Sequence, residues 1–386
     1  MPLYEQTLKD AILREVTQGL PSQSNINLPL AGLRIVLNAG NGSGSFFYKV
    51  LQDLGADVSS SINLTPDGNF PLSSGVPNPE YKPMIDETIQ ACESCMADLG
   101  IMLDTDADRC GLIVPCKQDS SVVRYEALNR NRLIALLSVI FSSSSPGCTI
   151  VTDSVTSEGL SRFLKQSLGL NHVRYLKGYA NVIGKAKELT ESGQALAEMA
   201  IETSGHCAMR ENGYLDDGTY TAVKVIGLLA RVSRSSHDAM IHPSLLDTST
   251  RRSPNLGLLN LIEELEEMNE VKELRMKVLD GTMESTDYIF RVLLQSIEDG
   301  CKVTKGWVLD IENLEGIRVR VGVEGGFFML RKSLHDPILS LQVEGASTEN
   351  VRSLVIQPLL QLFEAREKEQ GLEMKKIIQL DSLQSY

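Results

Sequence analysis

The spacing of apolar residues in the first 146 positions predicts buried strands that alternate with amphipathic helices. At the start of the chain, Leu8, Ile12 and Val16 recur every four residues, which is typical of the buried face of a helix. Short apolar runs between polar segments are typical of buried strands. The elements predicted here are helices over 4–18, 46–54, 82–96 and 126–141 and strands at Leu33–Leu37 and Leu99–Leu103.

A second stretch of the same plan follows the polar segment Ser142–Gly147, where we place a domain boundary. Strands that alternate with helices of about 10 to 15 residues are typical of sheets covered on both faces. The predicted elements are strands at Thr149–Thr152, Val173–Leu176 and Met199–Glu202 and helices at Ser157–Leu168, Ile183–Ser192 and Gly218–Val232.

The pattern changes after the polar segment 233–256. We expect an acidic helix over 258–270, then strands at Arg318–Gly322, Phe327–Leu330 and Ile338–Val343, then a helix at Glu349–Glu369. The expected fold class is α/β, with two three-layer α/β/α domains that contain mixed sheets, followed by a small α+β C-terminal domain. The expected divisions are an N-terminal helix and connector over 1–30 and domains over 31–146, 147–257 and 258–386.

The composition is that of an ordinary globular protein, with 42% hydrophobic and 23% charged residues. A net charge of -13 argues against nucleic acid as a partner, because sequence-independent binding depends on Lys and Arg neutralising phosphates. The chain has no run of about 18 apolar residues, so we expect no membrane span. Seven cysteines, with a single C-x-x-C at Cys92 and Cys95 in a predicted helix, favour reduced thiols over a disulfide framework or a zinc site.

Three carboxylates, Asp104, Asp106 and Asp108, follow the predicted strand Leu99–Leu103 at alternate positions. Clustered carboxylates repel one another unless a cation is present, and hard oxygen ligands suit Mg²⁺ or Ca²⁺. An EF-hand is excluded, because the sixth and twelfth loop positions would be Arg109 and Pro115 instead of Gly and Glu. Arg109 suits a phosphate oxygen that bridges to the metal. The alternative is a solvated acidic turn.

The segment from Glu202 to His206, with the sequence ETSGH, follows another predicted strand. Ligands bind at the carboxyl ends of strands in open α/β sheets. Glu202 and Ser204 can form hydrogen bonds with paired hydroxyl groups, and Gly205 permits a close approach. The alternative is a turn that leads into a helix, with a structural role for His206.

Two further loops are candidates for phosphate binding. The glycine-rich loop at 40–44 differs from a dinucleotide fingerprint, because Ser45 replaces the last glycine and Asp57 is too near. It favours a tight strand-to-helix turn. In the segment from Arg331 to Pro337, an arginine, the Ser333 hydroxyl and backbone N–H groups are suited to hold a phosphate, and a plain β-turn is the alternative.

Taken in this order, the four loops resemble the α-D-phosphohexomutase family, which includes phosphoglucomutases and phosphomannomutases. The resemblance covers about residues 30 to 370, and the stretches 178–183 and 216–218 within that range also resemble the family. The S-L-H-D-P loop is closest to a plant and bacterial branch of the family. It implies Mg²⁺ as cofactor and a hexose phosphate as ligand. Because the N-terminal sequence resembles no targeting signal and no membrane span is expected, we expect a soluble location in the cytoplasm or the plastid stroma. Members of the family have four domains, numbered I to IV. The implied metal loop in domain II is Asp104, Asp106, Asp108 and Arg109. The implied sugar-binding loop in domain III is Glu202, Ser204, Gly205 and His206, and the implied phosphate-binding loop in domain IV is Arg331, Ser333, His335 and Asp336.

The family's phosphoserine loop, of the type T-A-S-H-[NL]-P, is absent from this sequence. The resemblance therefore implies that the first domain is missing from this chain, and we expect neither Ser43 nor Ser204 to replace its serine. One hypothesis is a mutase that converts hexose 1-phosphates and 6-phosphates, with another chain or an upstream exon supplying the first domain. The alternatives are a non-catalytic protein that binds metal and sugar phosphate or a full-length mutase, and an unstable truncation without function. The sequence leaves open glucose, mannose and glucosamine phosphates.

Overall fold

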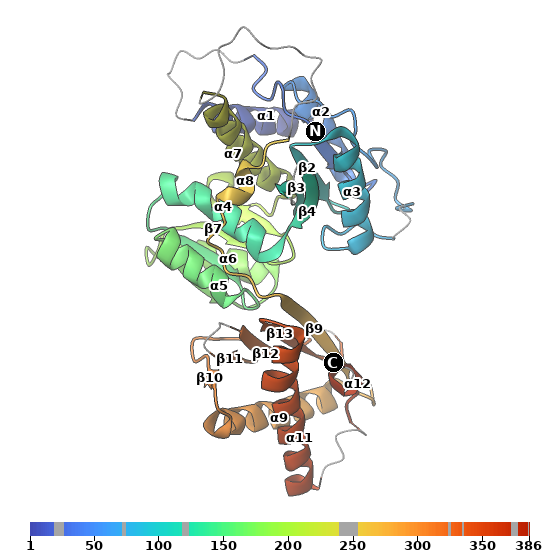
Figure 1. Ribbon diagram of the computed structural model, residues 1–386, viewed down its shortest axis with the longest axis vertical. Helices are drawn as coiled ribbons and strands as arrows, with labels where there is room; N and C mark the ends of the chain where they lie inside the picture. The colour runs from blue at the N-terminus through green and yellow to red at the C-terminus, as the bar shows by residue number, and fades with distance from the viewer. Residues whose placement is uncertain are drawn as a thin grey trace. The chain divides into compact units, whose positions relative to one another are not determined.

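The computed structural model describes residues 1–18, 27–71, 75–117, 123–238, 254–322, 326–333, 336–371, 377–384 and 386. These residues form two compact units (Figure 1). The first unit contains Met1–Thr152, Leu164–Val173 and Gly178–Leu265, and the second contains Asp153–Phe163, Arg174–Lys177 and Glu266–Tyr386. The domain boundaries expected after residues 30, 146 and 257 stay predictions.

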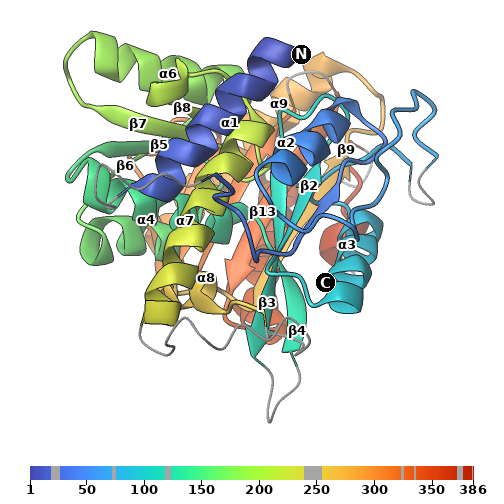
Figure 2. The same ribbon diagram turned by 90° about the horizontal axis from the view of Figure 1, so that it is seen from above.

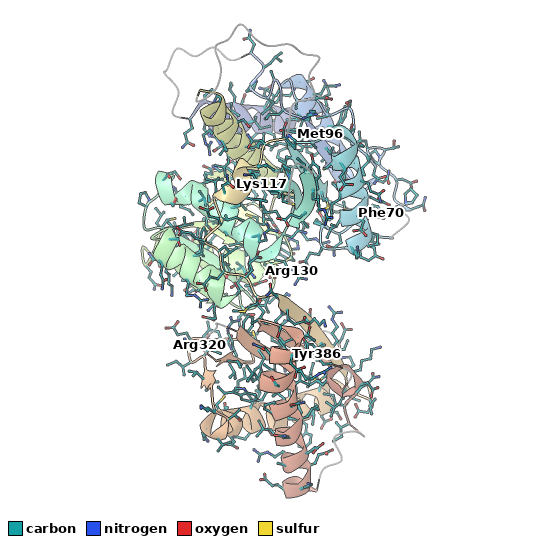
Figure 3. The ribbon with its side chains drawn as sticks, viewed as in Figure 1. Phe70, Met96, Lys117, Arg130, Arg320 and Tyr386 are labelled. Atoms are coloured by element: carbon teal, nitrogen blue, oxygen red, sulfur yellow. The ribbon has the colours of Figure 1, made fainter. Side chains whose placement is uncertain are left out.

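The N-terminal sheet has the strand order β1-β2-β3-β4, formed by Ile35–Asn38, Leu99–Leu103, Cys110–Lys117 and Val123–Leu128. β1 and β2 are parallel, whereas β3 is antiparallel to both β2 and β4. All five residues of β2 are buried, so both faces of this strand are covered. Helix α3 (Lys82–Cys95) packs against the sheet and ends at Met96, labelled in Figure 3, which has a left-handed φ of 55°.

The next sheet has the strand order β6-β5-β7-β8, formed by Asn171–Tyr175, Thr149–Asp153, Ala197–Ile201 and Cys207–Met209. β5 and β7 are parallel, and β7 and β8 are antiparallel. Helices α2 (Phe47–Asp53), α4 (Arg130–Ser144) and α6 (Tyr179–Glu191) belong to the first unit with these sheets, whereas α5 (Glu158–Arg162) belongs to the second. Two mixed sheets with helices confirm the predicted pair of α/β domains.

The helix predicted over 126–141 is wrong at its start, and β3 and β4 were not predicted. Val123–Leu128 pairs with β3, and α4 begins only at Arg130. Tyr125 and Leu128 are buried, so packing and ladder hydrogen bonds favour a strand here over a helix. Arg130, with a left-handed φ of 54°, separates the two elements.

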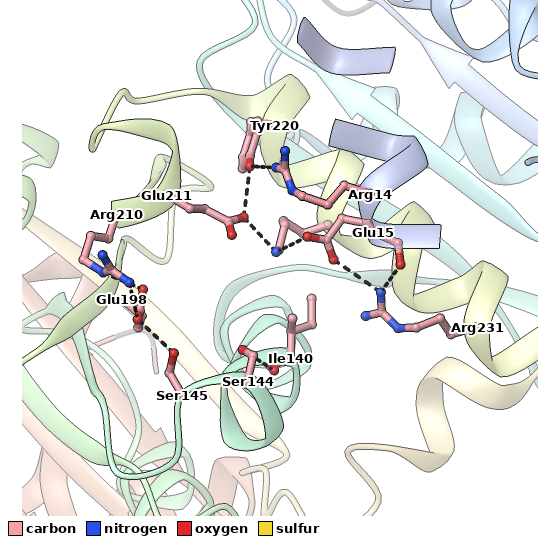
Figure 4. A network of polar contacts seen from close by, with 11 residues as sticks. Arg14, Glu15, Ile140, Ser144, Ser145, Glu198, Arg210, Glu211, Tyr220 and Arg231 are labelled. Carbon is pink, nitrogen blue, oxygen red and sulfur yellow. Dashed lines mark hydrogen bonds and ion pairs between the residues drawn. The ribbon is translucent and has the colours of Figure 1, made fainter. Parts of the chain in front are cut away.

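The N-terminal helix α1 (Pro2–Thr17) runs beside α7 (Gly218–Asp238) in the first unit (Figure 2). Lys224 of α7 is 3% exposed and pairs with Glu15 at 2.5 Å and Glu211 at 2.7 Å. Figure 4 shows these carboxylates together with Arg231, which also contacts Glu15. Buried charges are tolerated only when they are paired, so this network fixes α1 as an integral part of the first unit.

The second unit is built on an antiparallel sheet of order β10-β11-β12-β13-β9. Its strands are Trp307–Leu309, Ile317–Val321, Gly326–Lys332, Ile338–Gly345 and Glu270–Lys277. Helices α9 (Met283–Val303) and α11 (Gln357–Gln370) pack against each other and share the hydrophobic core with the sheet (Figure 1). This unit confirms the predicted small α+β fold.

Two predictions about helices need correction. The acidic helix expected over 258–270 is wrong, because α8 spans only Gly257–Asn260 and β9 begins at Glu270. Its closely spaced glutamates would repel one another on a helix. The helix expected at Glu349–Glu369 is α10 (Thr348–Val351), a π-helical turn at Arg352–Ile356 and α11. Within the described residues, no helix is both long and apolar enough to cross a membrane.

Candidate functional site

The acidic loop lies at the carboxyl end of β2, beside the glycine-rich loop that follows β1. Because β1 and β2 are parallel neighbours, the two loops leave the same edge of the sheet. The backbone N–H of Ser43 donates to the carbonyl of Thr105 at 2.9 Å. A Cβ atom on Gly42 would lie 2.6 Å from the same oxygen. Close packing against the acidic loop therefore accounts for glycine at position 42 without a bound dinucleotide.

The carboxylates of Asp104, Asp106 and Asp108 converge, with one oxygen from each within 4.8 Å of the others. Asp104 is 1% exposed and accepts hydrogen bonds from the Arg109 backbone N–H at 3.1 Å and from its Nε at 2.6 Å. Ala107, between the last two carboxylates, has a left-handed φ of 66°. The loop thus folds back so that its charged side chains meet.

Asp108 is the electrostatically strained member of this group. Burial and the nearby Asp104 carboxylate raise the pKa of Asp108 to about 7. Its Oδ1 atom is buried and has no hydrogen-bond partner among the described residues. Among the ion pairs of the described residues, Oδ1 has one cationic neighbour, Arg109 Nε, at 3.9 Å. Without a cation the loop carries a carboxylate that is costly to ionise.

The structure brings the Glu202–His206 loop next to the acidic loop. Arg109 and His206 form an antiparallel β-bridge, and the Cys110 N–H donates to the Gly205 carbonyl at 3.2 Å. Gly205 has a φ of 99°, and a Cβ atom there would lie 2.7 Å from the Cys110 carbonyl oxygen. Only glycine fits this contact without displacing the chain.

His206 lies between two carboxylates. Its Nδ1 atom is 2.8 Å from Asp216 Oδ2 and 3.6 Å from Asp108 Oδ2, and its ring stacks on Tyr179. Burial alone would lower the pKa of His206, but the hydrogen bond and charge of Asp216 outweigh it and raise that pKa. Asp216 and Tyr179 were not predicted as site residues, although both lie in stretches on which the resemblance rests.

Glu202 and Ser204 form the rest of this loop. Glu202 is 5% exposed, and its Oε1 accepts the Gly178 N–H at 2.6 Å. The Ser204 hydroxyl donates to Glu202 Oε2 at 3.3 Å. The carboxylate is therefore held in place by the chain itself, and it links the loop to the start of α6.

Arg331 and Ser333 lie in the second unit, at the end of β12. The Arg331 guanidinium is 3.5 Å from Glu315 and 3.6 Å from Glu273, and its buried Nε lacks a hydrogen-bond partner among the described residues. Ser333 Oγ accepts the Asp336 N–H at 3.2 Å, as in a tight turn. His335 lies outside the described residues.

Comparison with protein-family models gives two matches. Residues 14–117 match "Phosphoglucomutase/phosphomannomutase, alpha/beta/alpha domain II", and residues 129–244 match domain III of the same family. Together the two stretches span more than half of the chain. The acidic loop lies within the first stretch and the Glu202–His206 loop within the second.

Comparisons with individual proteins agree with these matches. A phosphomannomutase/phosphoglucomutase of Pseudomonas syringae pv. tomato is 26% identical over 254 residues, which cover 64% of this chain and 51% of the relative. A phosphoglucomutase/phosphomannomutase family protein from Burkholderia thailandensis superposes with a TM-score of 0.63 at 21% identity, over 94% of this chain and 64% of the other. An Aspergillus fumigatus N-acetylphosphoglucosamine mutase, crystallised with GlcNAc-6P and magnesium, has a TM-score of 0.51 at 12% identity, over 94% and 65%. The chain spans about half the length of the first of these relatives.

Proposed function

Because this chain belongs to the phosphoglucomutase/phosphomannomutase family, we propose that it binds a hexose phosphate together with Mg²⁺. The observation that carries the proposal is the convergence of Asp104, Asp106 and Asp108 beside the Glu202–His206 loop. A cluster of carboxylates suited to a metal ion and a loop suited to hydroxyl groups thus meet in one unit.

The acidic loop fits Mg²⁺ by its donor set. Asp104, Asp106 and Asp108 supply hard oxygen ligands, and the buried Oδ1 of Asp108 is without a partner among the described residues. When bound, Mg²⁺ neutralises negative charge on phosphoryl oxygens. The A. fumigatus mutase that shares the fold was crystallised with magnesium, which supports the choice of ion.

Arg109 and His206 are the cationic partners of the proposed ligand. Arg109 orients the Asp104 carboxylate through its backbone N–H and Nε, and its guanidinium has further N–H donors for a phosphate oxygen. His206 is held by Asp216 and stacked on Tyr179, so its ring is fixed beside the acidic loop. A protonated His206 offsets part of the charge of an incoming phosphate.

The remaining predicted residues would bind the sugar and its phosphate. We assign Glu202, Ser204 and Gly205 to sugar hydroxyl groups, because Glu202 is preoriented by Gly178. We assign Arg331 and Ser333, with His335 from outside the described residues, to phosphate. The ligand class is a hexose 1-phosphate or 6-phosphate. Relatives are named for mannose, glucose and N-acetylglucosamine phosphates.

The proposed reaction is an intramolecular phosphotransfer between the 1- and 6-positions of the hexose. Phosphoryl transfer is mostly positioning and electrostatic stabilisation, but it still needs a donor. The family's T-A-S-H serine loop is not among these 386 residues. We therefore propose that the phosphoserine comes from residues outside this sequence, in the same protein or in a second chain. The same observation favours a second candidate, a protein that binds metal and sugar phosphate without turnover.

Calorimetry on the purified chain tests the binding proposal. Glucose 1-phosphate and mannose 1-phosphate are titrated with and without Mg²⁺, into the wild type and into Asp106→Asn. We expect heat that depends on Mg²⁺ and is lost in the variant, while an exposed control, Asp10→Asn, behaves as wild type. Absence of heat at millimolar sugar phosphate in all conditions would overturn the proposal.

A coupled mutase assay separates the two candidate functions. The chain is assayed with Mg²⁺ and a hexose 1,6-bisphosphate, alone and with an added phosphoserine domain from a family member. Turnover that appears only with the added domain supports the mutase. Binding without turnover in either condition supports the non-catalytic protein.

A further inference from the structure

Arg331 is buried in the second unit between two carboxylates. The shortest separations from its guanidinium are 3.5 Å to Glu315 Oε1 and 3.6 Å to Glu273 Oε1. Both are ion-pair distances at the long end of hydrogen bonding, and the Arg331 Nε is unsatisfied among the described residues. The two carboxylates thus neutralise the charge of the guanidinium, but its hydrogen bonds to them are long and weak.

Glu315 is held firmly on its other side. Its Oε2 accepts the Ser154 hydroxyl at 2.5 Å and the Lys177 backbone N–H at 2.9 Å. The next residue, Gly316, has a φ of 58°, and a Cβ atom there would lie 2.0 Å from the Leu330 carbonyl oxygen. The Glu315–Gly316 corner is therefore pressed against the strand that carries Arg331.

The groups around the Glu315 carboxylate are those that bind a phosphate. A hydroxyl, a backbone N–H and a guanidinium all face one anion, and phosphate oxygens use the same three kinds of donor. All of these residues belong to the second unit. A phosphate that approaches Arg331 must therefore compete with a carboxylate of the protein.

We propose that Glu315 is an internal competitor for phosphate, which holds the Arg331 guanidinium in place and lowers its affinity for an external phosphate group. This inference rests on the proposed function, which assigns Arg331 to phosphate. Glu315 is a positioning residue and has no part in any chemical step. Glu273, which lies 3.6 Å from the other terminal nitrogen of the Arg331 guanidinium, acts in the same direction through its charge alone.

The test is calorimetry of the full chain with inorganic phosphate, for wild type, Glu315→Gln, Glu273→Gln and the control Glu312→Gln. A glutamine side chain can still accept from Ser154 and Lys177, so the corner keeps its shape while the charge facing Arg331 is removed. We expect the Kd of Glu315→Gln to fall roughly tenfold, because a charge this close to the anion is only partly screened. Glu273→Gln should bind severalfold more tightly. Glu312 is exposed in the same loop between β10 and β11. Replacing it with glutamine removes a charge that does not contact Arg331, so the Kd should stay unchanged.

The outcomes distinguish this inference from the proposed function. Trp307, the one tryptophan of the sequence, lies in the second unit, so its fluorescence on heating verifies that each variant folds. If Arg331→Ala abolishes phosphate binding but Glu315→Gln leaves it unchanged or weakens it, the inference that Glu315 competes with phosphate is refuted and the proposed function is not. Binding that Arg331→Ala does not change overturns both, as does an absence of binding in every variant.

Discussion

Replacing Asp108 with asparagine should stabilise the metal-free protein and at the same time abolish its response to Mg²⁺. The pKa of Asp108 is raised from its ordinary 3.8 to about 7, chiefly by burial and by Asp104. At about 1.4 kcal/mol per pKa unit, ionising this group in the folded protein costs at most about 4 kcal/mol. The side chain is 29% exposed, and solvent screening reduces the expected gain to about 1–2 kcal/mol.

The pH dependence follows from the direction of this shift. Because the folded pKa lies above the unfolded one, the wild type loses stability as the pH rises from 4 to 7, and the loss is complete above 7. The amide side chain of the Asp108→Asn variant does not ionise. The advantage of this variant should therefore be largest at pH 8 and vanish below pH 4.

Urea unfolding at pH 5 and pH 8, with and without 10 mM Mg²⁺, measures both effects. A ligand at a hundred times its Kd stabilises the folded state by about 2.7 kcal/mol, so Mg²⁺ should stabilise the wild type and leave Asp108→Asn unchanged. Asp106→Asn is the matched control: Asp106 is exposed, so this variant should lose the Mg²⁺ response without gaining stability. An Asp108→Asn protein that is less stable at pH 8, or that keeps its Mg²⁺ response, would refute the reasoning.

Three other changes test separate parts of the structure. Lys224→Met should destabilise the first unit by about 3 kcal/mol in urea unfolding, because it leaves Glu15 buried without this partner, and an unchanged midpoint would contradict the network. Gly205→Ala should lower the melting temperature and weaken sugar-phosphate binding, since its Cβ would press on the Cys110 carbonyl; full binding in calorimetry would argue against the loop contact. In the native protein Cys92 should resist alkylation by iodoacetamide, because burial raises the pKa of its thiol, and mass spectrometry that finds it modified before unfolding would contradict this burial.

The fold was predictable wherever one local pattern decided the element. The apolar run Leu99–Leu103 is β2 at its predicted bounds, and the periodicity over 82–96 gave α3 to within one residue. β3 and β4 were missed because their evidence is a pairing between strands, which has no local period. The helix predicted over 258–270 was wrong although its evidence was local. The composition of this segment favours a helix, but repulsion between its closely spaced glutamates opposes one.

The candidate site was predictable as separate loops but not as one arrangement. Alternate spacing singled out the three aspartates, and the position after a predicted strand singled out the Glu202–His206 loop. Their contact depends on the bridge between Arg109 and His206, residues nearly a hundred positions apart. The role of Asp216, which holds the His206 ring, depends equally on tertiary structure.

The charges of the acidic loop give the strongest physical reason to place a divalent ion there. Three carboxylates and the Arg109 guanidinium leave two negative charges in excess when Asp108 is ionised. The Asp216 carboxylate lies 2.8 Å from His206 Nδ1, so it faces the charge of that ring when the ring is protonated. In the metal-free loop the raised pKa of Asp108 favours its protonated form, which removes part of this excess charge. The Oδ1 atom of Asp108 has no hydrogen-bond partner among the described residues. A purely structural turn gains nothing from such an arrangement, because a neutral residue at position 108 would fold at lower cost. The excess charge of the loop therefore supports the proposed cation site over a solvated acidic turn.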